Sequence, residues 1–332
     1  MPPPVTESEI QSRLSRLGDL RAAIATAIVG QHEVVEQLLT GLLAGGHCLL
    51  EGVPGLGKTL LVRTLGQALD LQFRRVQFTP DLMPSDLLGT ELLEEDHGTG
   101  HRHFRFQQGP VFTNLLLADE LNRTPPKTQA ALLEAMQEHT VSFAGVTHAL
   151  PAPFFVLATQ NPIEQAGTYP LPEAQLDRFL LHVVVGLPDA ASERKILDLV
   201  ERETAGHEEA MPLRLSADEV RQARREVANV HLAPALKDYI VRLVSATRDA
   251  DAAPEVRRAI EYPVSPRGTL SLAAASKARA YLAGRDHVTP DDVADLAADT
   301  LAHRLVLTWR AAADGRTARD LVRPLLDAVR PV

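Results

Sequence analysis

Residues 52–59, which read Gly-Val-Pro-Gly-Leu-Gly-Lys-Thr, constrain this chain more than any other stretch. They fit the pattern G-x-x-x-x-G-K-[ST] of a loop that holds nucleotide phosphates. A short apolar stretch, residues 47–51, precedes the loop, and Leu61, Leu65 and Leu69 follow it at helical spacing. We therefore predict a buried strand, the phosphate-binding loop and a helix, in that order.

Each residue type in this loop has a physical reason. Glycines allow positive φ and remove the Cβ atoms that would keep a phosphate away, and the N-terminus of the following helix favours an anion. The Lys58 amine is expected to reach the β- and γ-phosphates, and the Thr59 hydroxyl to ligate Mg²⁺. The residues to which we assign nucleotide binding here are Gly52, Val53, Pro54, Gly55, Leu56, Gly57, Lys58, Thr59 and Leu60.

Charge and hydropathy exclude several classes of partner. The net charge of −9 gives the chain no general attraction to nucleic acid or to acidic membranes. No apolar run approaches the length of a membrane span, and the start of the chain lacks the charged and apolar regions of a signal peptide. We therefore expect a cytoplasmic protein without a membrane span.

Two acidic residues end the apolar stretch of residues 111–120, which we predict to be a buried strand. Open α/β sheets bind ligands at the carboxyl ends of their strands, where Asp119 and Glu120 would lie. Asp119 can then hold Mg²⁺, and Glu120 can polarise a water for attack on the γ-phosphate. A strand that simply ends in polar residues is the alternative.

Two further positions are candidates for contacts with the nucleotide. Asn161 follows the predicted strand 154–159 and would reach the γ-phosphate or the attacking water if that strand neighbours the strand ending at Asp119. The alternative is a plain Asn-Pro turn. Val29 and Gly30 form a turn ahead of the phosphate-loop strand, where an adenine ring could lie, although Val29 could equally be a core residue.

Residues 79–110 read as an insertion that carries a hairpin, and residues 139–150 read as a second hairpin around Ala144 and Gly145. His97, His101 and His103 in the first insertion could ligate a metal. We favour a solvated hairpin, because no acidic or cysteine ligand stands at tight spacing.

The chain becomes helical after Leu187, with segments near 190–202, 216–229, 233–249, 266–283 and 290–303, and with loops at 204–214 and 250–264. Arg267 would lie in the first turn that follows Pro266, where a nearby phosphate would offset its unfavourable position on the helix dipole. Arg178 precedes the predicted strand 180–185, and a salt bridge with Asp177 or Glu173 is its simplest role.

Together these motifs resemble the AAA+ ATPases, and among them the MoxR type of the helix-2-insert group. The stretches that carry the resemblance are residues 52–59, 78–86, 118–127, 158–162 and 171–179. The resemblance implies an α/β fold: an AAA+ phosphate-loop core of three layers around a parallel sheet, followed by an all-α lid. The core would span residues 1–188, with insertions at about 79–110 and 138–150, and the lid residues 189–332.

Residue roles follow from the same resemblance. Asn161 corresponds to the first sensor of the family, and Arg267 to the second sensor, which reaches ATP from the lid. Arg178 corresponds to the arginine finger, which acts on ATP held by the neighbouring subunit, with Arg123 as a second candidate for an interface arginine. That arrangement implies a homo-oligomeric ring, usually a hexamer, that binds ATP and Mg²⁺.

The resemblance also implies an activity: a chaperone-like ATPase that remodels or matures protein complexes, with a protein client and a partner that bears a von Willebrand factor A domain. A nucleic-acid motor of the helix-2-insert group is the alternative. The hairpin at residues 139–150 has no Lys or Arg to meet phosphates, which argues against nucleic acid as a partner. A non-hydrolysing scaffold is disfavoured because Glu120, Asn161 and Arg178 are all present.

Overall fold

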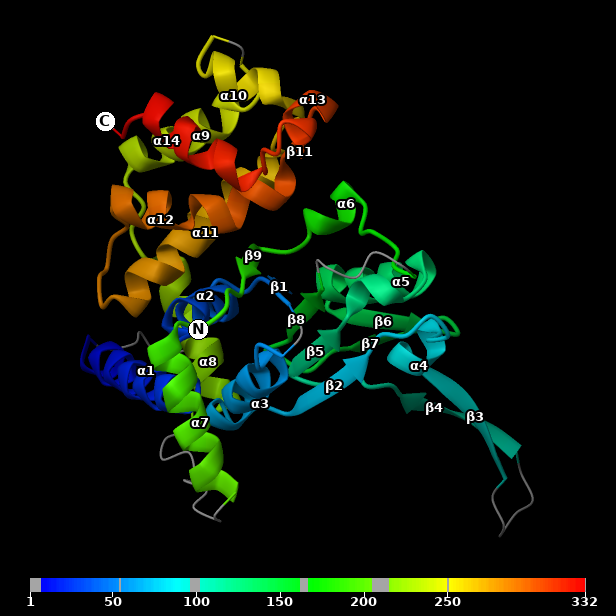
Figure 1. The fold of residues 1–332 in the computed structure, drawn as a ribbon. Helices are drawn as coiled ribbons and strands as arrows, with labels where there is room; N and C mark the ends of the chain where they lie inside the picture. The colour runs from blue at the N-terminus through cyan, green and yellow to red at the C-terminus, as the bar shows by residue number, and fades with distance from the viewer. Residues whose placement is uncertain are drawn as a thin grey trace.

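The computed structural model describes residues 7–53, 55–95, 102–161, 167–204, 215–249 and 251–331. A five-stranded parallel sheet with strand order β2-β5-β8-β1-β9 lies at its centre (Figure 1). The strands are β1 (Cys48–Glu51), β2 (Phe73–Gln77), β5 (Leu115–Asp119), β8 (Phe155–Gln160) and β9 (Leu181–Val184). The order confirms the α/β class and makes neighbours of the strands that end next to Glu120 and Asn161.

Helices cover both faces of the sheet, because its central strands are apolar on both sides. Leu50 and Leu117 face α2 (His32–Leu43) and α3 (Lys58–Ala68), whereas Leu49 and Leu116 face α5 (Pro126–Glu138). The long helix α1 (Glu7–Ala27) packs against α2 and α3. A core of three layers, helix, sheet and helix, therefore positions the carboxyl ends of the strands.

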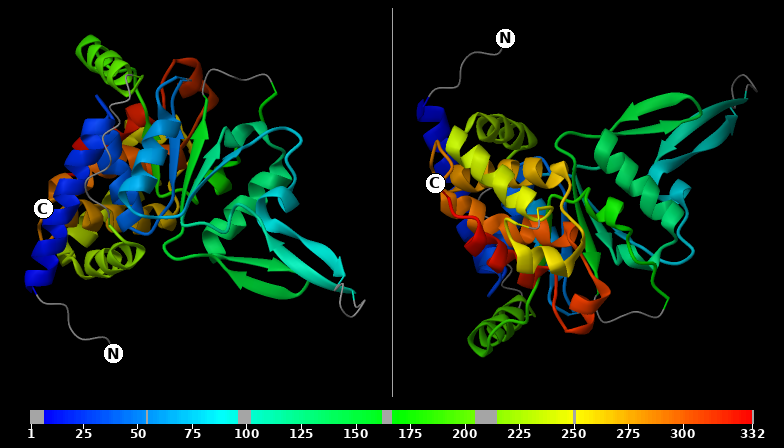
Figure 2. Two further views of the ribbon diagram at one scale, coloured as in Figure 1. Left: turned by 90° about the horizontal axis from the view of Figure 1, so that it is seen from below. Right: turned by 90° about the horizontal axis from the view of Figure 1, so that it is seen from above.

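Both insertions are hairpins, and they lie against each other. The first consists of α4 (Pro84–Leu88), β3 (Gly89–Glu95) and β4 (Arg102–Gln108), and the second of β6 (Thr140–Phe143) and β7 (Val146–Ala149). The Phe106 ring stacks on His148 with 4.4 Å between ring centroids and lies 5.4 Å from Phe143. In both views of Figure 2 the hairpins project on the side away from α1 and the C-terminal helices.

The C-terminal part is helical, and it packs onto the core. Its helix α11 contacts other lid helices and also the core helix α2, while α8 contacts α1 and α2. Its helices are α7 (Ala190–Thr204), α8 (Ala217–Asn229), α9 (Pro234–Ala246), α10 (Pro254–Ala259), α11 (Pro266–Leu282), α12 (Pro290–Leu301), α13 (Trp309–Ala313) and α14 (Val322–Ala328). No helix in the described ranges combines the length and apolarity that a membrane crossing needs.

The structure corrects several element boundaries. The strand predicted over 111–120 begins only at Leu115, because residues 111–114 form a turn. The loop predicted over 250–264 contains α10 and β10 (Ile260–Tyr262), which pairs with β11 (Val306–Leu307), so the helical lid also has a two-stranded sheet. Short elements such as these are fixed by packing of a few side chains, here Val256 and Ala259, rather than by a long periodic pattern. The predicted loop at 204–214 lies almost wholly outside the described residues.

A buried histidine, His47, joins two layers of the core. His47 Nδ1 accepts a hydrogen bond from the Val156 amide at 3.0 Å, and its Nε2 lies 3.0 Å from the Met136 carbonyl oxygen. Burial lowers the pKa of His47 to about 3, and the nearby His139 and Arg224 add to the effect. Both ring nitrogens are therefore satisfied in the neutral form.

We predict that the free energy of unfolding falls as the pH drops from about 6.5 towards 3. In this window an unfolded chain binds a proton at His47 that the folded chain excludes, which costs up to about 1.4 kcal/mol per pH unit. Urea unfolding at pH 7 and pH 5 measures the difference. His47→Asn should flatten the dependence, whereas His32→Asn at an exposed position should not. An equal slope in wild type and His47→Asn would contradict the assignment.

Candidate functional site

The phosphate-binding loop occupies the strand-to-helix junction that the sequence predicted, between β1 and α3. Gly57 caps α3 in the left-handed region at φ 69°, and Gly55 has φ 87°, conformations that side chains with a Cβ rarely adopt. A Cβ on Gly52 would lie 2.9 Å from the Val185 carbonyl oxygen. Pro54 lies outside the described residues. The loop is thus a cradle of backbone at a helix N-terminus, which suits a phosphate chain.

Lys58 is the first residue of α3, and its amine turns back over the loop. The Lys58 Nζ donates to the Gly52 carbonyl oxygen at 2.5 Å and to that of Gln160 at 3.5 Å. Burial lowers the pKa of Lys58, and the carboxylates of Asp119 and Glu120 act in the opposite direction. The amine therefore lies between the ends of β1 and β8, close to both acids.

Asp119 ends β5 as predicted, and its carboxylate is held by two neighbouring strands. Its Oδ1 accepts a hydrogen bond from Thr159 Oγ1 at 2.6 Å, and its Oδ2 accepts from Arg75 Nη2 at 2.6 Å and Nε at 3.0 Å. Asp119 is 8% exposed, so these partners fix the carboxylate against the sheet.

Glu120 stands in the left-handed region at φ 57° and ψ 48°, which turns its side chain out of the strand. Its amide donates to Thr159 Oγ1 at 2.8 Å, and its Oε2 accepts from Gln77 Nε2 at 2.6 Å. Arg123 Nε lies 3.1 Å from the same oxygen. Arg123, predicted as an alternative interface residue, therefore contacts the acid of its own chain.

Three residues at this site were not predicted: Arg75, Gln77 and Thr159. Arg75 and Gln77 are two apart on β2 and so share a face, and Gln77 is in register with Asp119. Thr159 lies between the two acids because β8 is the strand beside β5. The available signal was Thr159, a polar residue in the otherwise apolar run of β8, whereas β2 is mostly polar, so Arg75 and Gln77 do not stand out in it.

The other predicted contacts of the nucleotide lie at the same edge of the sheet. Asn161 directly follows β8 and is buried. A Cβ on Gly30 would meet the Ser192 hydroxyl at 2.8 Å, and Gln31 Nε2 donates to the Gly186 carbonyl oxygen at 3.3 Å. The turn of Val29 and Gly30 is thus next to the segment that follows β9, and its contact with adenine stays a prediction.

Arg178 and Arg267 lie at the opposite edge of the sheet. Both line a hollow of about 280 Å³, together with residues 45–47, which precede β1. The length of β1, roughly 13 Å at the usual rise per strand residue, separates that edge from the phosphate-binding loop. The structure therefore does not bring Arg267 to the phosphate-binding loop of its own chain, and its contact with ATP stays a prediction. Packing of α11 on α2 sets the position of Arg267, and the helical periodicity of the sequence does not predict that packing.

The residues present fit a magnesium nucleotide. The Thr59 hydroxyl and the Asp119 carboxylate are the hard oxygen ligands that Mg²⁺ prefers, and Mg²⁺ usually keeps waters and substrate phosphates as its other ligands. Among the described residues there is no cluster of three or more metal-binding side chains. His103 lies on β4, with its Nε2 3.8 Å from Glu94 Oε2, while His97 and His101 fall outside the described residues.

Comparison with known proteins shows the family. Residues 47–181 match the model of the ATPase family associated with various cellular activities (AAA). The chaperone MoxR1 of Mycobacterium tuberculosis is 45% identical over 304 residues, which are 91% of this chain and 78% of that protein. Protein MoxR of Paracoccus denitrificans is 33% identical, over 91% of this chain and 92% of that protein. The chain belongs to the MoxR family of AAA+ ATPases.

A solved structure extends the likeness of this MoxR-family protein to its whole fold. A chain from Cytophaga hutchinsonii, named a candidate ATPase, is 40% identical, covers 98% of both chains and superposes with a TM-score of 0.90. Residues 252–325 match the AAA lid domain. The α/β core with a helical lid is therefore the fold of this MoxR-family chain, and α7, α8 and α9 precede the part that the lid model matches.

Proposed function

We propose that this MoxR-type protein hydrolyses ATP at sites shared between neighbouring subunits of a ring, most simply a hexamer. The observation that carries the proposal is the division of polar and charged residues between two edges of the sheet. Lys58, Asp119, Glu120 and Asn161 gather at the carboxyl edge, whereas Arg178 and Arg267 share a hollow at the other edge. A second copy is needed for the arginines to meet a nucleotide.

The chain's own residues then divide the reaction among them. The loop and Lys58 bind the phosphates, and Thr59 and Asp119 would hold Mg²⁺, which supplies neutralisation of the phosphate charge. Glu120 accepts a hydrogen bond from the attacking water and polarises it, and Asn161 orients that water or the γ-phosphate. Arg178 and Arg267 of the neighbouring subunit stabilise charge on the γ-phosphate as its bond breaks.

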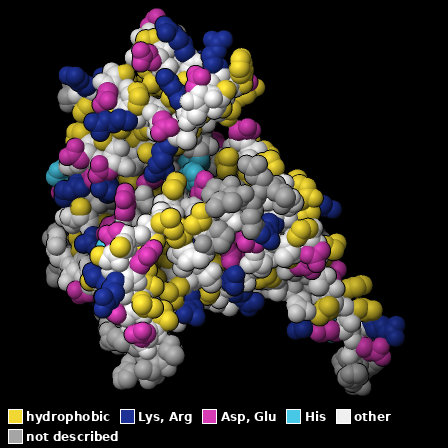
Figure 3. Space-filling view, in the orientation of Figure 1, with side chains coloured by type: hydrophobic (Ala, Val, Ile, Leu, Met, Phe, Trp, Pro, Cys, Tyr) yellow, Lys and Arg dark blue, Asp and Glu magenta, His cyan; other side chains and the backbone are white. Residues whose placement is uncertain are grey.

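We propose that this cycle remodels or matures a protein complex, together with a partner that bears a von Willebrand factor A domain. The name of the relative MoxR1, a chaperone, supports a protein client. The projecting hairpin exposes Leu93 and Phe104, at 56% and 69%, and Figure 3 shows apolar side chains along it. Its Arg102 and Arg105 pair with Glu95 and Glu94, so they do not form a basic surface for nucleic acid.

Steady-state ATPase measurements with Mg²⁺, with EDTA and with DNA test the activity. We expect turnover that needs Mg²⁺ and does not change with DNA. Stimulation by DNA that disappears as salt rises would favour the nucleic-acid motor instead. Glu120→Gln loaded with ATP should retain a client and a von Willebrand factor A-domain partner that wild type releases. Lys58→Ala, which has no bound ATP, is the matched control for that capture.

A further inference from the structure

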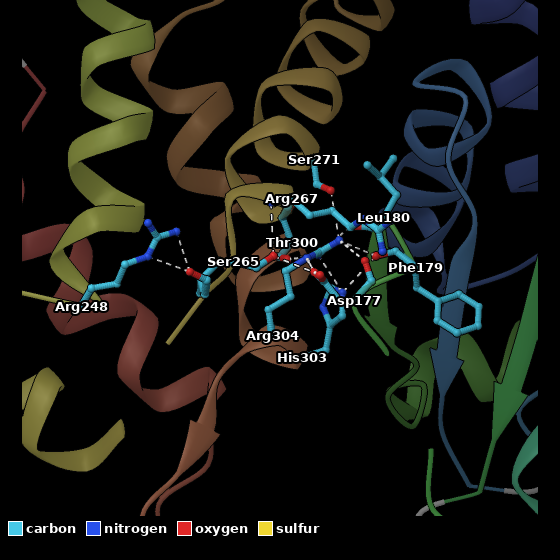
Figure 4. A network of polar contacts seen from close by, with 11 residues as sticks. Asp177, Phe179, Leu180, Arg248, Ser265, Arg267, Ser271, Thr300, His303 and Arg304 are labelled. Carbon is cyan, nitrogen blue, oxygen red and sulfur yellow. Dashed lines mark hydrogen bonds and ion pairs between the residues drawn. The ribbon is translucent and has the colours of Figure 1, made fainter. Parts of the chain in front are cut away.

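A buried guanidinium in the lid contacts the core segment that carries Arg178 (Figure 4). Arg304 ends the short helix η2 (Ala302–Arg304), and its side chain is 1% exposed. Its Nε donates to Asp177 Oδ1 at 2.7 Å, and its Nη2 donates to the Phe179 carbonyl oxygen at 2.7 Å. Arg304 thus binds residues on both sides of Arg178 in sequence.

The same guanidinium is fastened to the lid. Arg304 Nη2 donates to Ser271 Oγ on α11 at 3.0 Å, and its Nη1 donates to the Thr300 carbonyl oxygen on α12. A Cβ on Gly268 would lie 2.3 Å from Val264 Cγ1 and 3.3 Å from Arg304 Cδ. The absence of a side chain at Gly268 therefore lets the start of α11 lie directly on Arg304.

Asp177 completes the connection to Arg267. Its Oδ2 accepts a hydrogen bond from Ser265 Oγ at 3.0 Å, and Ser265 Oγ in turn accepts from the Arg267 amide at 3.2 Å as the cap of α11. One carboxylate therefore lies between Arg304 and the first turn of α11. Arg178 follows that carboxylate in sequence, and Arg267 lies two residues after the serine.

We propose that Arg304, Asp177 and Ser265 form a joint that holds Arg178 and Arg267 as one unit, so that both enter the neighbouring nucleotide site together. Arg304 is then a positioning residue for hydrolysis. This inference rests on the proposed shared site.

The chemistry of the contacts explains why an arginine stands at this position. Burial lowers the pKa of Arg304 to about 10, while Asp177 acts in the opposite direction, so the guanidinium stays charged at neutral pH. Its planar fork reaches Asp177, Phe179 and Ser271 at once, which a lysine ammonium cannot reproduce. A change in the angle between lid and core therefore moves both arginines together.

The variant Arg304→Lys tests the joint, because it keeps the charge and loses the fork. Misplacement of catalytic groups by about 1 Å costs on the order of 10²-fold in rate, so we expect kcat to fall by that order. KM for ATP and nucleotide binding should stay within about twofold, because the subunit's own loop is intact. Arg285→Lys is the matched control: Arg285 pairs with buried Asp292 inside the lid, away from the joint, and turnover should be unchanged.

Mixing subunits separates positioning from general damage. Lys58→Ala subunits cannot hydrolyse but present intact arginines, so adding them to Arg304→Lys should restore part of the turnover. Ser265→Ala removes the hydrogen bond to Asp177 and the cap of α11 but leaves the Arg304 contacts in place, so it should show a smaller loss with the same rescue. It is the test variant if Arg304→Lys does not fold. Arg178→Ala mixed with Lys58→Ala in the same way shows how much turnover the mixing can restore when the arginine itself is missing.

The outcomes are distinguishable. Wild-type turnover in both Arg304→Lys and Ser265→Ala would overturn the joint, as would a loss that Lys58→Ala does not rescue while it rescues Arg178→Ala. If Arg178→Ala itself is never rescued, the shared site fails and the joint fails with it.

Discussion

Replacing Arg178 with alanine is expected to lower kcat by about 10³–10⁵, the range for an arginine finger in related phosphoryl-transfer chemistry. Arg178 lies at the amino edge of the sheet, across the length of β1 from Lys58, so its effect should fall on the neighbouring subunit's nucleotide. ATP binding by the variant should remain close to wild type, because its own loop, Asp119 and Glu120 are untouched. Steady-state hydrolysis and nucleotide titration measure the two quantities.

The decisive measurement for Arg178 uses mixed rings. Arg178→Ala and Lys58→Ala are each expected to hydrolyse little ATP alone, but a mixture places intact Arg178 next to an intact loop at some interfaces. Turnover should therefore reappear and pass through a maximum as the ratio varies. Lys58→Ala mixed with Glu120→Gln is the control: such a ring has no subunit with both a loop and a catalytic acid, so it should stay inactive. No recovery at any ratio of the first pair would exclude action across an interface.

Glu120→Gln is expected to bind ATP, assemble and lose hydrolysis by about 10²–10⁴, the usual contribution of a positioned general base. The amide keeps the size of the side chain and its contact with Gln77, but it polarises a water weakly. Glu134→Gln, at an exposed position on α5, is a matched control that should leave kcat unchanged. Normal turnover by Glu120→Gln would remove Glu120 from the water-polarising role.

Local sequence was sufficient to predict that the loop and the two acids lie at one edge of the sheet. The glycine-rich loop and the two acids sit at strand ends, and strand ends at one edge of a parallel sheet converge whatever the details of packing. Asn161 lies near them because β8 is next to β5. From the sequence this neighbourhood was only a condition, and the structure shows that it is met.

Long-range packing decided the rest. Arg75 and Gln77 reach the acids only because β2 pairs with β5, although other segments separate the two strands in the chain. Arg267 lies at the other edge because the lid packs on α2 and so places the start of α11 there. Helical periodicity identifies the buried face of a helix and carries no information on which edge of another domain that face will meet.

The stack of Phe106 on His148 has a mechanical consequence. It joins the two hairpins, of which the first follows α4 and the second follows α5. Helix α5 begins at Pro126, only a few residues after Glu120, so we expect a force on the first hairpin to reach the segment of Glu120 through these aromatic rings and α5. A force on the first hairpin would then bear on the position of Glu120, the residue proposed to polarise the attacking water.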